Sequence, residues 1–256
     1  MRDIRINGHR IRMYDDIETL PVVRFHKYNK MLLLDAGIGS DLSDFAAHVQ
    51  RAKHFARKGD DNALTELDNL LQNVMLIQQE LSPRHLAFAV LVAEVDGVAC
   101  GDLSDEGLRR TLERVQDISN AELTAELQSA KKKIDGELTA YFPEMFDSPE
   151  AKEYGDNVAR RAELILQEIT GGVDNSGKIA AITGRMMDAS RPKRFGADGN
   201  AEVIHDKSFG SMCLLMSQEL HADAKKMTVL EFYTANEYLE RLSKERKKIL
   251  NNGRRK

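Results

Sequence analysis

The chain has 256 residues, of which 42% are hydrophobic, 30% are charged and 6% are aromatic, and its formal net charge is −4. This composition is typical of a soluble globular protein, and the length allows one large domain or two smaller ones. The small net charge gives no general attraction to nucleic acid or to a membrane surface, so neither is favoured as a partner. The absence of tryptophan and the presence of only five prolines favour helices over a β-sandwich.

The cysteines and the N-terminus indicate the cellular compartment. Cys100 and Cys213 are far apart and belong to no CxxC motif, so we expect reduced thiols in a cytoplasmic protein. The first residues contain no apolar core of a signal peptide, and none is predicted. The longest apolar stretch, Leu86 to Val95, is about half of a bilayer span. A membrane protein is therefore not expected.

The first residues predict a β-hairpin. Apolar and polar residues alternate on both sides of Asn7-Gly8, a dipeptide that favours a type I′ turn. Two strands alone are only marginally stable. We therefore expect the hairpin to lie against helices or to pair with a partner's sheet.

Helix patterns follow almost without interruption. The first predicted helix runs from Pro21 to Asp35 and ends at Gly37-Ile38-Gly39. Two apolar stripes at helical spacing come next: Leu42, Phe45, Val49 and Ala52, then Leu64, Leu67, Leu70, Leu71 and Val74. A third run opens at Ser82-Pro83 and extends to Val95. Because it is apolar on nearly all sides, we expect it in the middle of a helical bundle.

The segment 119–141 has the clearest amphipathic pattern. Ser119 and Glu122 form a capping box at its start. Its apolar residues recur at nearly heptad spacing: Leu123, Leu127, Ala130, Ile134, Leu138 and Tyr141. This stripe predicts either a helix on the chain's own bundle or a coiled-coil seam to a partner. Leu127, Ile134 and Leu138 are accordingly candidate partner-binding residues.

The second half is predicted to begin after a boundary within 141–149, which contains two prolines. The expected domains are 1–142, a hairpin plus helical bundle, and 148–256, a second helical region. In the latter we expect a helix over 149–169, a Gly-rich loop over 171–206 with one short helix at 179–187, and a helix over 209–220. A capping box of Thr228 and Glu231 starts the long final helix, which places Phe232 and Leu239 on one face. A basic tail closes the chain: Arg241, Lys244, Arg246, Lys247, Lys248, Arg254, Arg255 and Lys256. The predicted fold is all-α, a multi-helix bundle with a short N-terminal β-hairpin.

Two patterns suggest ligand binding but have simpler explanations. Gly172, Gly177 and Lys178 match GxxxxGK, yet Ile179 replaces the Ser/Thr hydroxyl of a P-loop, and the preceding residues have a helical pattern. Asp96 and Asp102 lie beside a predicted loop, where carboxylates bind a hard cation or cap a helix. Nucleotide binding at 172–178 and metal binding at Asp96 and Asp102 stay open as alternatives. No HExxH or GxSxG motif occurs, so we expect neither catalysis nor a cofactor.

Two family resemblances extend these expectations. Leu86 to Glu126, with Glu94-Val95-Asp96-Gly97 before a short acidic loop, resembles the helical hairpin of TerB-like proteins. That resemblance implies a metal-responsive domain in which Asp96 contributes to binding. Residues 4–13 (IRINGHRIRM), 20–45 and 227–248 resemble phage tail-morphogenesis proteins, in particular tail-assembly chaperones. These are helical proteins that coat the tape-measure protein until the tail tube forms around it.

The phage resemblance and the lack of a catalytic motif lead to one functional expectation. We expect a non-catalytic phage structural or assembly protein, either a tail-assembly chaperone or a neck or connector component. Its partners would be other phage assembly proteins or further copies of itself. The expected contact residues are Leu127, Ile134, Leu138, Phe232 and Leu239. The expected location is the host cytoplasm, with a place in the virion as the other option.

Overall fold

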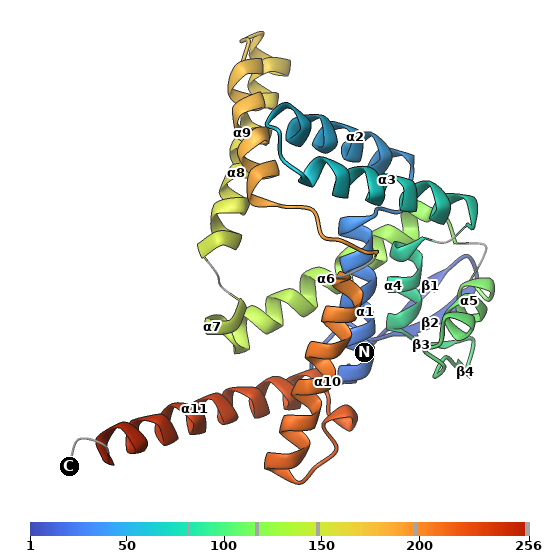
Figure 1. Cartoon of the computed structure of the whole chain (residues 1–256). Helices are drawn as coiled ribbons and strands as arrows, with labels where there is room; N and C mark the ends of the chain where they lie inside the picture. Colours follow the sequence, from blue (N-terminus) through green and yellow to red (C-terminus); the bar gives the residue numbers. More distant parts are fainter. Residues whose placement is uncertain (81, 116–117, 147–148, 197–198, 254–256) are drawn as a thin grey trace. The chain divides into compact units, whose positions relative to one another are not determined.

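The computed structural model describes residues 1–80, 82–115, 118–146, 149–196 and 199–253. It is 72% helical, with eleven α-helices in the described residues and a small antiparallel sheet that begins at the N-terminus (Figure 1). The predicted all-α fold with a short N-terminal β-hairpin is confirmed. None of the helices in the described part of the chain is long and apolar enough to cross a membrane.

The chain forms two compact units, and each is assembled from segments that are distant in sequence. Unit 1 comprises 1–35, 83–138 and 202–256, and unit 2 comprises 36–82 and 139–201. This division differs from the predicted domains 1–142 and 148–256. Segments far apart in sequence pair with one another, and a boundary drawn along the chain does not capture such pairing.

Unit 1 contains the sheet, whose strand order is β1-β2-β3-β4 with all neighbours antiparallel. β1 (Arg2–Ile6) and β2 (His9–Met13) form the predicted hairpin. Asn7 and Gly8 have φ values of 48° and 88°, as a type I′ turn requires. The hairpin does not stand alone, because β2 also pairs with β3 (Val92–Val95) of the same chain.

The apolar run before Asp96 changes from helix to strand, so the predicted helix up to Val95 is wrong in its second part. α4 (Pro83–Leu91) ends at Leu91, and β3 begins at the next residue. Asp96 and Gly97, with φ values of 50° and 83°, form a second hairpin turn to β4 (Val98–Ala99). The β-branched valines of this run suit a strand, and pairing with β2 decides the outcome.

A buried arginine stabilises this change from helix to strand. The Arg24 guanidinium lies in α1 (Val22–Gly37) and donates to the carbonyls of Val90 (2.6 Å) and Val92 (3.1 Å), and to that of Cys100. Carbonyls at the end of a helix lack partners within the helix. Arg24 supplies these partners inside the core, and burial lowers the pKa of its guanidinium.

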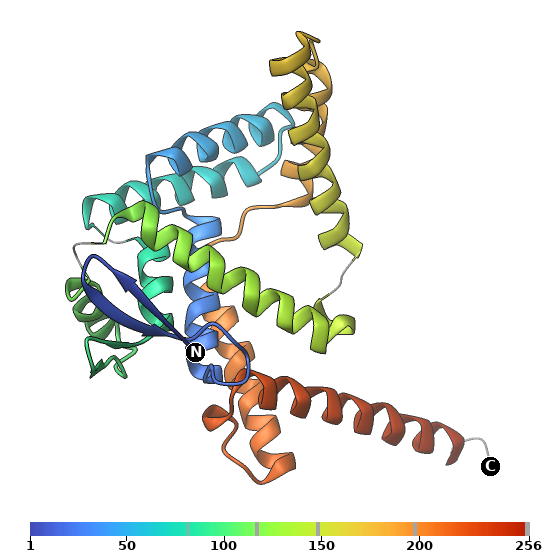
Figure 2. The same cartoon turned by 180° about the vertical axis from the view of Figure 1, so that it is seen from behind.

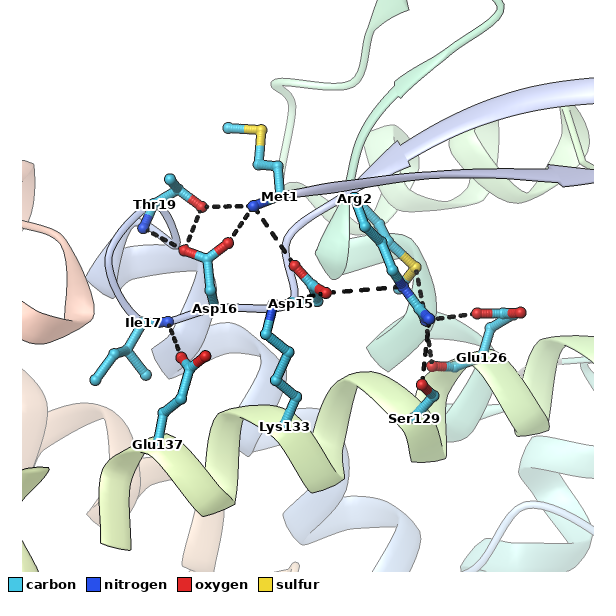
Figure 3. Close-up of polar contacts among 11 residues, drawn as sticks. Met1, Arg2, Asp15, Asp16, Ile17, Thr19, Glu126, Ser129, Lys133 and Glu137 are labelled. Carbon is cyan, nitrogen blue, oxygen red and sulfur yellow. Dashed lines mark hydrogen bonds and ion pairs between the residues drawn. The ribbon is translucent and has the colours of Figure 1, made fainter. Parts of the chain in front are cut away.

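Side chains from the loop after β2 and from α6 (Asn120–Tyr141) form a polar cluster with the first two residues (Figure 3). The α-amino group of Met1 contacts Asp16 and lies 3.5 Å from Asp15 Oδ1. Lys133 of α6 binds the other oxygen of Asp15 at 3.0 Å. Burial by itself would raise the pKa of Asp16, but hydrogen bonds from the α-amino group and from Thr19 lower it to about 2.

In a second part of unit 1, the start of α1 packs with α10 (Ala201–Leu220) and α11 (Val229–Gly253). A short 3-10 helix at Ala224–Lys226 lies between α10 and α11 in the chain. Their shared core contains Val22, Cys213, Met216, Ala224 and Phe232. The capping box predicted for the last helix is present: the amide of Thr228 donates to Glu231 (2.8 Å), and the amide of Glu231 donates back to the Thr228 hydroxyl (3.3 Å). α11 projects away from the rest of unit 1 in both views (Figures 1 and 2).

Unit 1 also contains a stack of aromatic rings between α1 and α10. The His26 ring is stacked on His205 and on Phe209, with centroid distances of 4.3 and 4.0 Å. Asp206 accepts from His26 Nε2 at 2.9 Å and from Lys30 at 2.7 Å. Burial is the main reason that the pKa of His26 is lowered, and the hydrogen bond to Asp206 opposes this shift.

Unit 2 is built from two antiparallel helix pairs. α2 (Leu42–Arg57) lies beside α3 (Asn62–Gln78), and α8 (Pro149–Gly171) lies beside α9 (Ser176–Ala189) (Figures 1 and 2). The short α7 (Pro143–Phe146) precedes α8. The short helix predicted at 179–187 is present as the longer α9, and the predicted loop over 171–206 is too long at its end, because α10 begins at Ala201.

The turn between α1 and α2 explains two of the glycines at the predicted end of the first helix. A Cβ atom at Gly37 would lie 2.3 Å from the Phe195 ring, and Gly39 has a φ of 91°. Both positions therefore require glycine, the first for close approach and the second for its left-handed backbone. Phe195 belongs to the buried core of unit 2, together with Phe55 of α2.

Candidate protein-interaction surface

The α2–α3 pair of unit 2 has a polar interior. In α3 the buried side chains are Thr65, Glu66, Asn69 and Asn73, and three of these four are no more than 1% exposed. Polar residues of this kind are rarely fully buried unless they are paired. The inward face of α3 is thus unusually polar for a protein interior.

Three side chains form the centre of this interior. Glu66 Oε2 lies 2.7 Å from His48 Nδ1, and Glu66 Oε1 accepts from Arg51 Nε at 2.8 Å. His48 Nε2 lies 2.8 Å from the carbonyl oxygen of Ile38. Because that oxygen only accepts, Nε2 carries a proton. The negative charge of Glu66 is compensated by Arg51, and His48 ties α3 to the turn before α2.

The two buried asparagines continue the polar interior toward the other end of α3. Asn69 donates to the carbonyl of Lys193 at 3.0 Å. The side chain of Asn73 is fully buried, next to Gly39. Within the described residues, neither polar atom of the Asn73 side chain has a hydrogen-bond partner, and neither does Asn69 Oδ1. An unsatisfied buried amide costs about 1–3 kcal/mol, so the Asn73 side chain lowers the stability of the α2–α3 pair.

The opposite face of α3 is apolar and exposed. Its exposed fractions are 65% for Leu64, 50% for Leu67, 62% for Leu71 and 52% for Met75. Single exposed apolar residues are ordinary, but a contiguous patch on one helix face marks an interaction surface. We call these four residues the α3 stripe. α3 therefore buries four polar side chains and exposes the four apolar side chains of the stripe, while its other large apolar residues, Leu70, Val74, Leu76 and Ile77, are partly buried.

The predicted partner-binding residues of α6 do not form such a surface. Leu127, Ile134 and Leu138 are 4%, 0% and 2% exposed. They lie within the chain's own core, together with the fully buried Ala130. The predicted partner seam is therefore corrected to an ordinary amphipathic helix, the other interpretation of the same spacing. Its capping box is present, with Glu122 accepting from the Ser119 amide at 3.1 Å.

The predicted contact face of the last helix is also largely internal. Phe232 is 7% exposed and belongs to the core shared by α1, α10 and α11, and Leu239 packs against that core. The basic residues from Arg241 to Lys248 are exposed on α11. Arg254, Arg255 and Lys256 lie outside the described residues.

The two carboxylates proposed for metal binding each accept a hydrogen bond from a backbone amide. Asp96 accepts from the amide of Arg10 at 2.8 Å and contacts His9 Nδ1 at 2.7 Å. Asp102 accepts from the amide of Ser104 at 2.9 Å and from Arg110 at 2.6 Å. The described residues contain no group of three His, Cys, Asp or Glu side chains that could hold a metal ion.

The GxxxxGK segment lies in a helical hairpin. Gly172, with a φ of 62°, follows the end of α8, while Gly177 and Lys178 lie in the first turn of α9. A P-loop follows a strand and uses open amides to hold phosphates. Here Asn175 is buried and bonds back to Leu164 of α8 at 3.3 Å. The segment is thus a helix–helix turn, as the pattern before it predicted.

The polar interior of the α2–α3 pair was not predicted, although the sequence contains a signal for it. Thr65, Glu66, Asn69 and Asn73 recur at helical spacing and therefore share one face. The leucines on the other face give the stronger signal, and they normally face inward. No protein-family model, no curated protein and no solved structure gives a significant match to this chain.

Proposed function

We propose that this protein is a non-catalytic assembly factor that acts by binding protein surfaces, as a phage tail-assembly chaperone or a neck or connector component does. The α3 stripe is the observation that carries this proposal. Its four large apolar side chains are each at least half exposed and share one face of a single helix, and apolar residues gathered on one exposed face are a feature of protein-interaction sites.

The phage context in this proposal comes from the resemblance of residues 4–13, 20–45 and 227–248 to tail-morphogenesis proteins. Under this proposal the protein acts in the host cytoplasm, or becomes part of the virion. The α2–α3 pair contributes a rigid platform, because the network of His48, Arg51 and Glu66 fixes which face of α3 points outward. A rigid helix face loses little conformational entropy on binding.

The metal-responsive and nucleotide-binding alternatives have less support. The carboxylates of Asp96 and Asp102 already bind backbone amides and basic side chains. Lys178 Nζ lies 3.5 Å from Asn175 Oδ1, within a helix–helix turn. Neither site has an arrangement that favours its ligand over the structural role that it already performs.

The test compares three forms of the full chain as bait in a lysate of the phage-infected host: wild type, Leu71→Glu and Gln50→Glu. Gln50 is exposed on α2, so its substitution adds the same charge without changing the α3 stripe. We expect wild type and Gln50→Glu to retain a virion or assembly protein encoded beside this chain, and Leu71→Glu to lose it. Retention of that protein by all three forms would remove the α3 stripe from the proposal. If no virion or assembly protein is retained and wild type sediments as a monomer, the assembly function is overturned.

A further inference from the structure

The contact between α1 and α10 in unit 1 changes in character along its length. In the second half of α10 it is apolar, because Val22 of α1 shares a core with Met216. In the first two turns of α10, residues 201–208, the large apolar side chains are exposed instead: Val203 by 45% and Ile204 by 55%. The contacts that join these two turns to α1 are accordingly polar and aromatic.

His26 is the centre of these contacts. Its ring is nearly parallel to that of His205, with an interplanar angle of 8° and a centroid distance of 4.3 Å. His26 Nε2 lies 2.9 Å from Asp206 Oδ1, and His205 Nε2 donates to the carbonyl of His26 at 3.2 Å. One turn further along α1, Lys30 Nζ lies 2.7 Å from Asp206 and 3.5 Å from Glu202. Each of these five side chains is ionisable, so the contact depends on pH.

The charge balance of these five side chains reverses on acidification. With both imidazoles uncharged, one ammonium group, that of Lys30, faces the carboxylates of Asp206 and Glu202, and the carboxylates outnumber the cations. A proton on each ring makes three cations against the same two carboxylates. It also places two positive charges on rings whose centroids are 4.3 Å apart. Like charges this close in a partly buried site repel one another, and separation of α10 from α1 relieves the repulsion.

The surroundings of His26 favour its uncharged form in the folded chain. Burial lowers the pKa of His26, and the hydrogen bond to Asp206 opposes this shift. Positive charge on His205 or Lys30 lowers the same pKa. A released imidazole regains the ordinary pKa of about 6.5, so opening of the contact takes up protons. The closed contact is fully stable above that pH and loses stability as the pH falls below it.

Two other helices of unit 1 lie near this cluster. Tyr233 of α11 packs against α1, and burial raises the pKa of its hydroxyl, which therefore stays uncharged across the histidine range. From α5 (Asp105–Glu113), Asp105 accepts from Lys27 at 2.9 Å. This ion pair is balanced in itself. Neither helix therefore reverses the charge balance of the cluster.

We infer that the stacked His26–His205 pair makes the α1–α10 contact acid-sensitive: residues 201–208 lie against α1 at neutral pH and separate from it when both rings are protonated. The second half of α10 stays in place, because its contact with Val22 is apolar. The inference concerns a regulated change within unit 1 and does not depend on the proposed assembly function.

Hydrogen exchange of the full chain measures the separation, at about pH 7.5 and about pH 5.5, on either side of the ordinary histidine pKa. Separated turns fray, because so short a helical segment is unstable without packing. After correction for the intrinsic effect of pH, amides in 205–208 should lose protection severalfold at the lower pH, and those in 212–220 should keep theirs. Equal protection of 205–208 at both pH values would overturn the inference. An equal loss in both segments would also overturn it, because the whole helix would then be opening.

Three variants test whether the two histidines are the cause. His205→Phe keeps a ring against His26 without a charge, and the double variant His26→Phe with His205→Phe removes both titrating groups. The loss of protection should be smaller in the single variant and absent in the double variant. His221→Asn is the matched control and should behave as wild type, because His221 is exposed beyond the end of α10 and its φ of 53° suits asparagine. An unchanged loss in the double variant would assign the effect to Asp206 and Glu202 and overturn the inference.

The coupling between the two rings is measured separately, by NMR titration of the His26 ring. In His205→Phe the midpoint of this titration should move to higher pH, because the neighbouring positive charge is gone. His205→Gln, whose side chain is smaller, takes the place of His205→Phe if the phenyl ring disturbs folding. An unmoved midpoint would show that the rings titrate independently, and would overturn the inference.

Discussion

Two helices of this protein have similar apolar patterns, but one buries its apolar residues and the other exposes them. α6 in unit 1 carries Leu127, Ile134 and Leu138 at nearly heptad spacing, and these residues are buried. α3 in unit 2 carries Leu64, Leu67 and Leu71 at the same kind of spacing, and these residues are at least half exposed. The apolar face of a helix is thus readable from sequence, but the partner that covers it is not.

The difference between the two helices lies in their other face. The polar face of α6 consists of charged residues that reach solvent, such as Lys131 and Asp135, which pair with one another. α3 instead carries short amides and a glutamate that is matched by His48 and Arg51 of α2. Because these partners fix its polar face inward, the apolar face of α3 is left for another surface.

The largest expected effect on stability comes from a charge placed on the buried apolar face of α6. Ile134→Glu places an unpaired carboxylate at a fully buried position, and we expect it to lower the free energy of unfolding by about 5 kcal/mol. Urea denaturation followed by circular dichroism measures this loss. Ile134→Leu is the matched control and should cost less than about 1.5 kcal/mol. If Ile134→Glu stays folded and changes the association of the protein, the apolar face of α6 contacts a partner, as the coiled-coil interpretation predicted.

A smaller effect is expected when the polar interior beside α3 is disrupted. Glu66→Ala removes the buried carboxylate shared by His48 and Arg51, and should cost about 2 kcal/mol, because the buried Nδ1 of His48 and the partly buried Arg51 guanidinium lose this partner. Urea denaturation of Glu66→Ala, of Arg51→Ala and of the double variant gives the coupling free energy between the two side chains. If Glu66→Ala is as stable as wild type, the polar network does not determine the orientation of α3.

The pH dependence of stability tests a polar contact of unit 1, in which Asp16 pairs with the α-amino group of Met1. Its pKa is lowered from 3.8 to about 2 in the folded protein, so the folded state favours the carboxylate. This stabilisation is fully present above pH 3.8 and is lost as the pH falls toward 2, amounting to about 2 kcal/mol. The unfolding free energy of Asp16→Asn, measured from pH 5 to pH 2, should lack this component. Parallel curves for the two proteins would contradict the assignment.

The smallest expected effect on stability belongs to the α3 stripe. Leu71→Glu introduces the same side chain as Ile134→Glu, but at a position that is 62% exposed. At a concentration where the chain is monomeric, we expect its unfolding free energy to stay within about 0.5 kcal/mol of wild type. Thermal and urea denaturation of the dilute protein measure the difference. A loss as large as that of Ile134→Glu would show that the chain itself buries the stripe.

Much of the local structure was predictable, because it depends on neighbouring residues. The Asn7-Gly8 hairpin and the capping boxes at Ser119 and Thr228 all formed as predicted. The segment from Val92 to Val95 was not predictable, because an apolar run suits a buried helix and a buried strand equally. The candidate site was missed for a related reason: His48 and Glu66 are eighteen residues apart, and nothing local marks them as partners.

The sequence by itself determined the helical class, the hairpin, most helix boundaries and the amphipathic face of each helix, since these follow from backbone preference and periodicity. Tertiary structure alone decided that α4 stops where β2 offers hydrogen bonds, and that Arg24 occupies the carbonyls freed there. It also decided which face of α3 points inward. That choice depends on whether buried polar groups find partners, and partners distant in sequence are known only once the chain has folded.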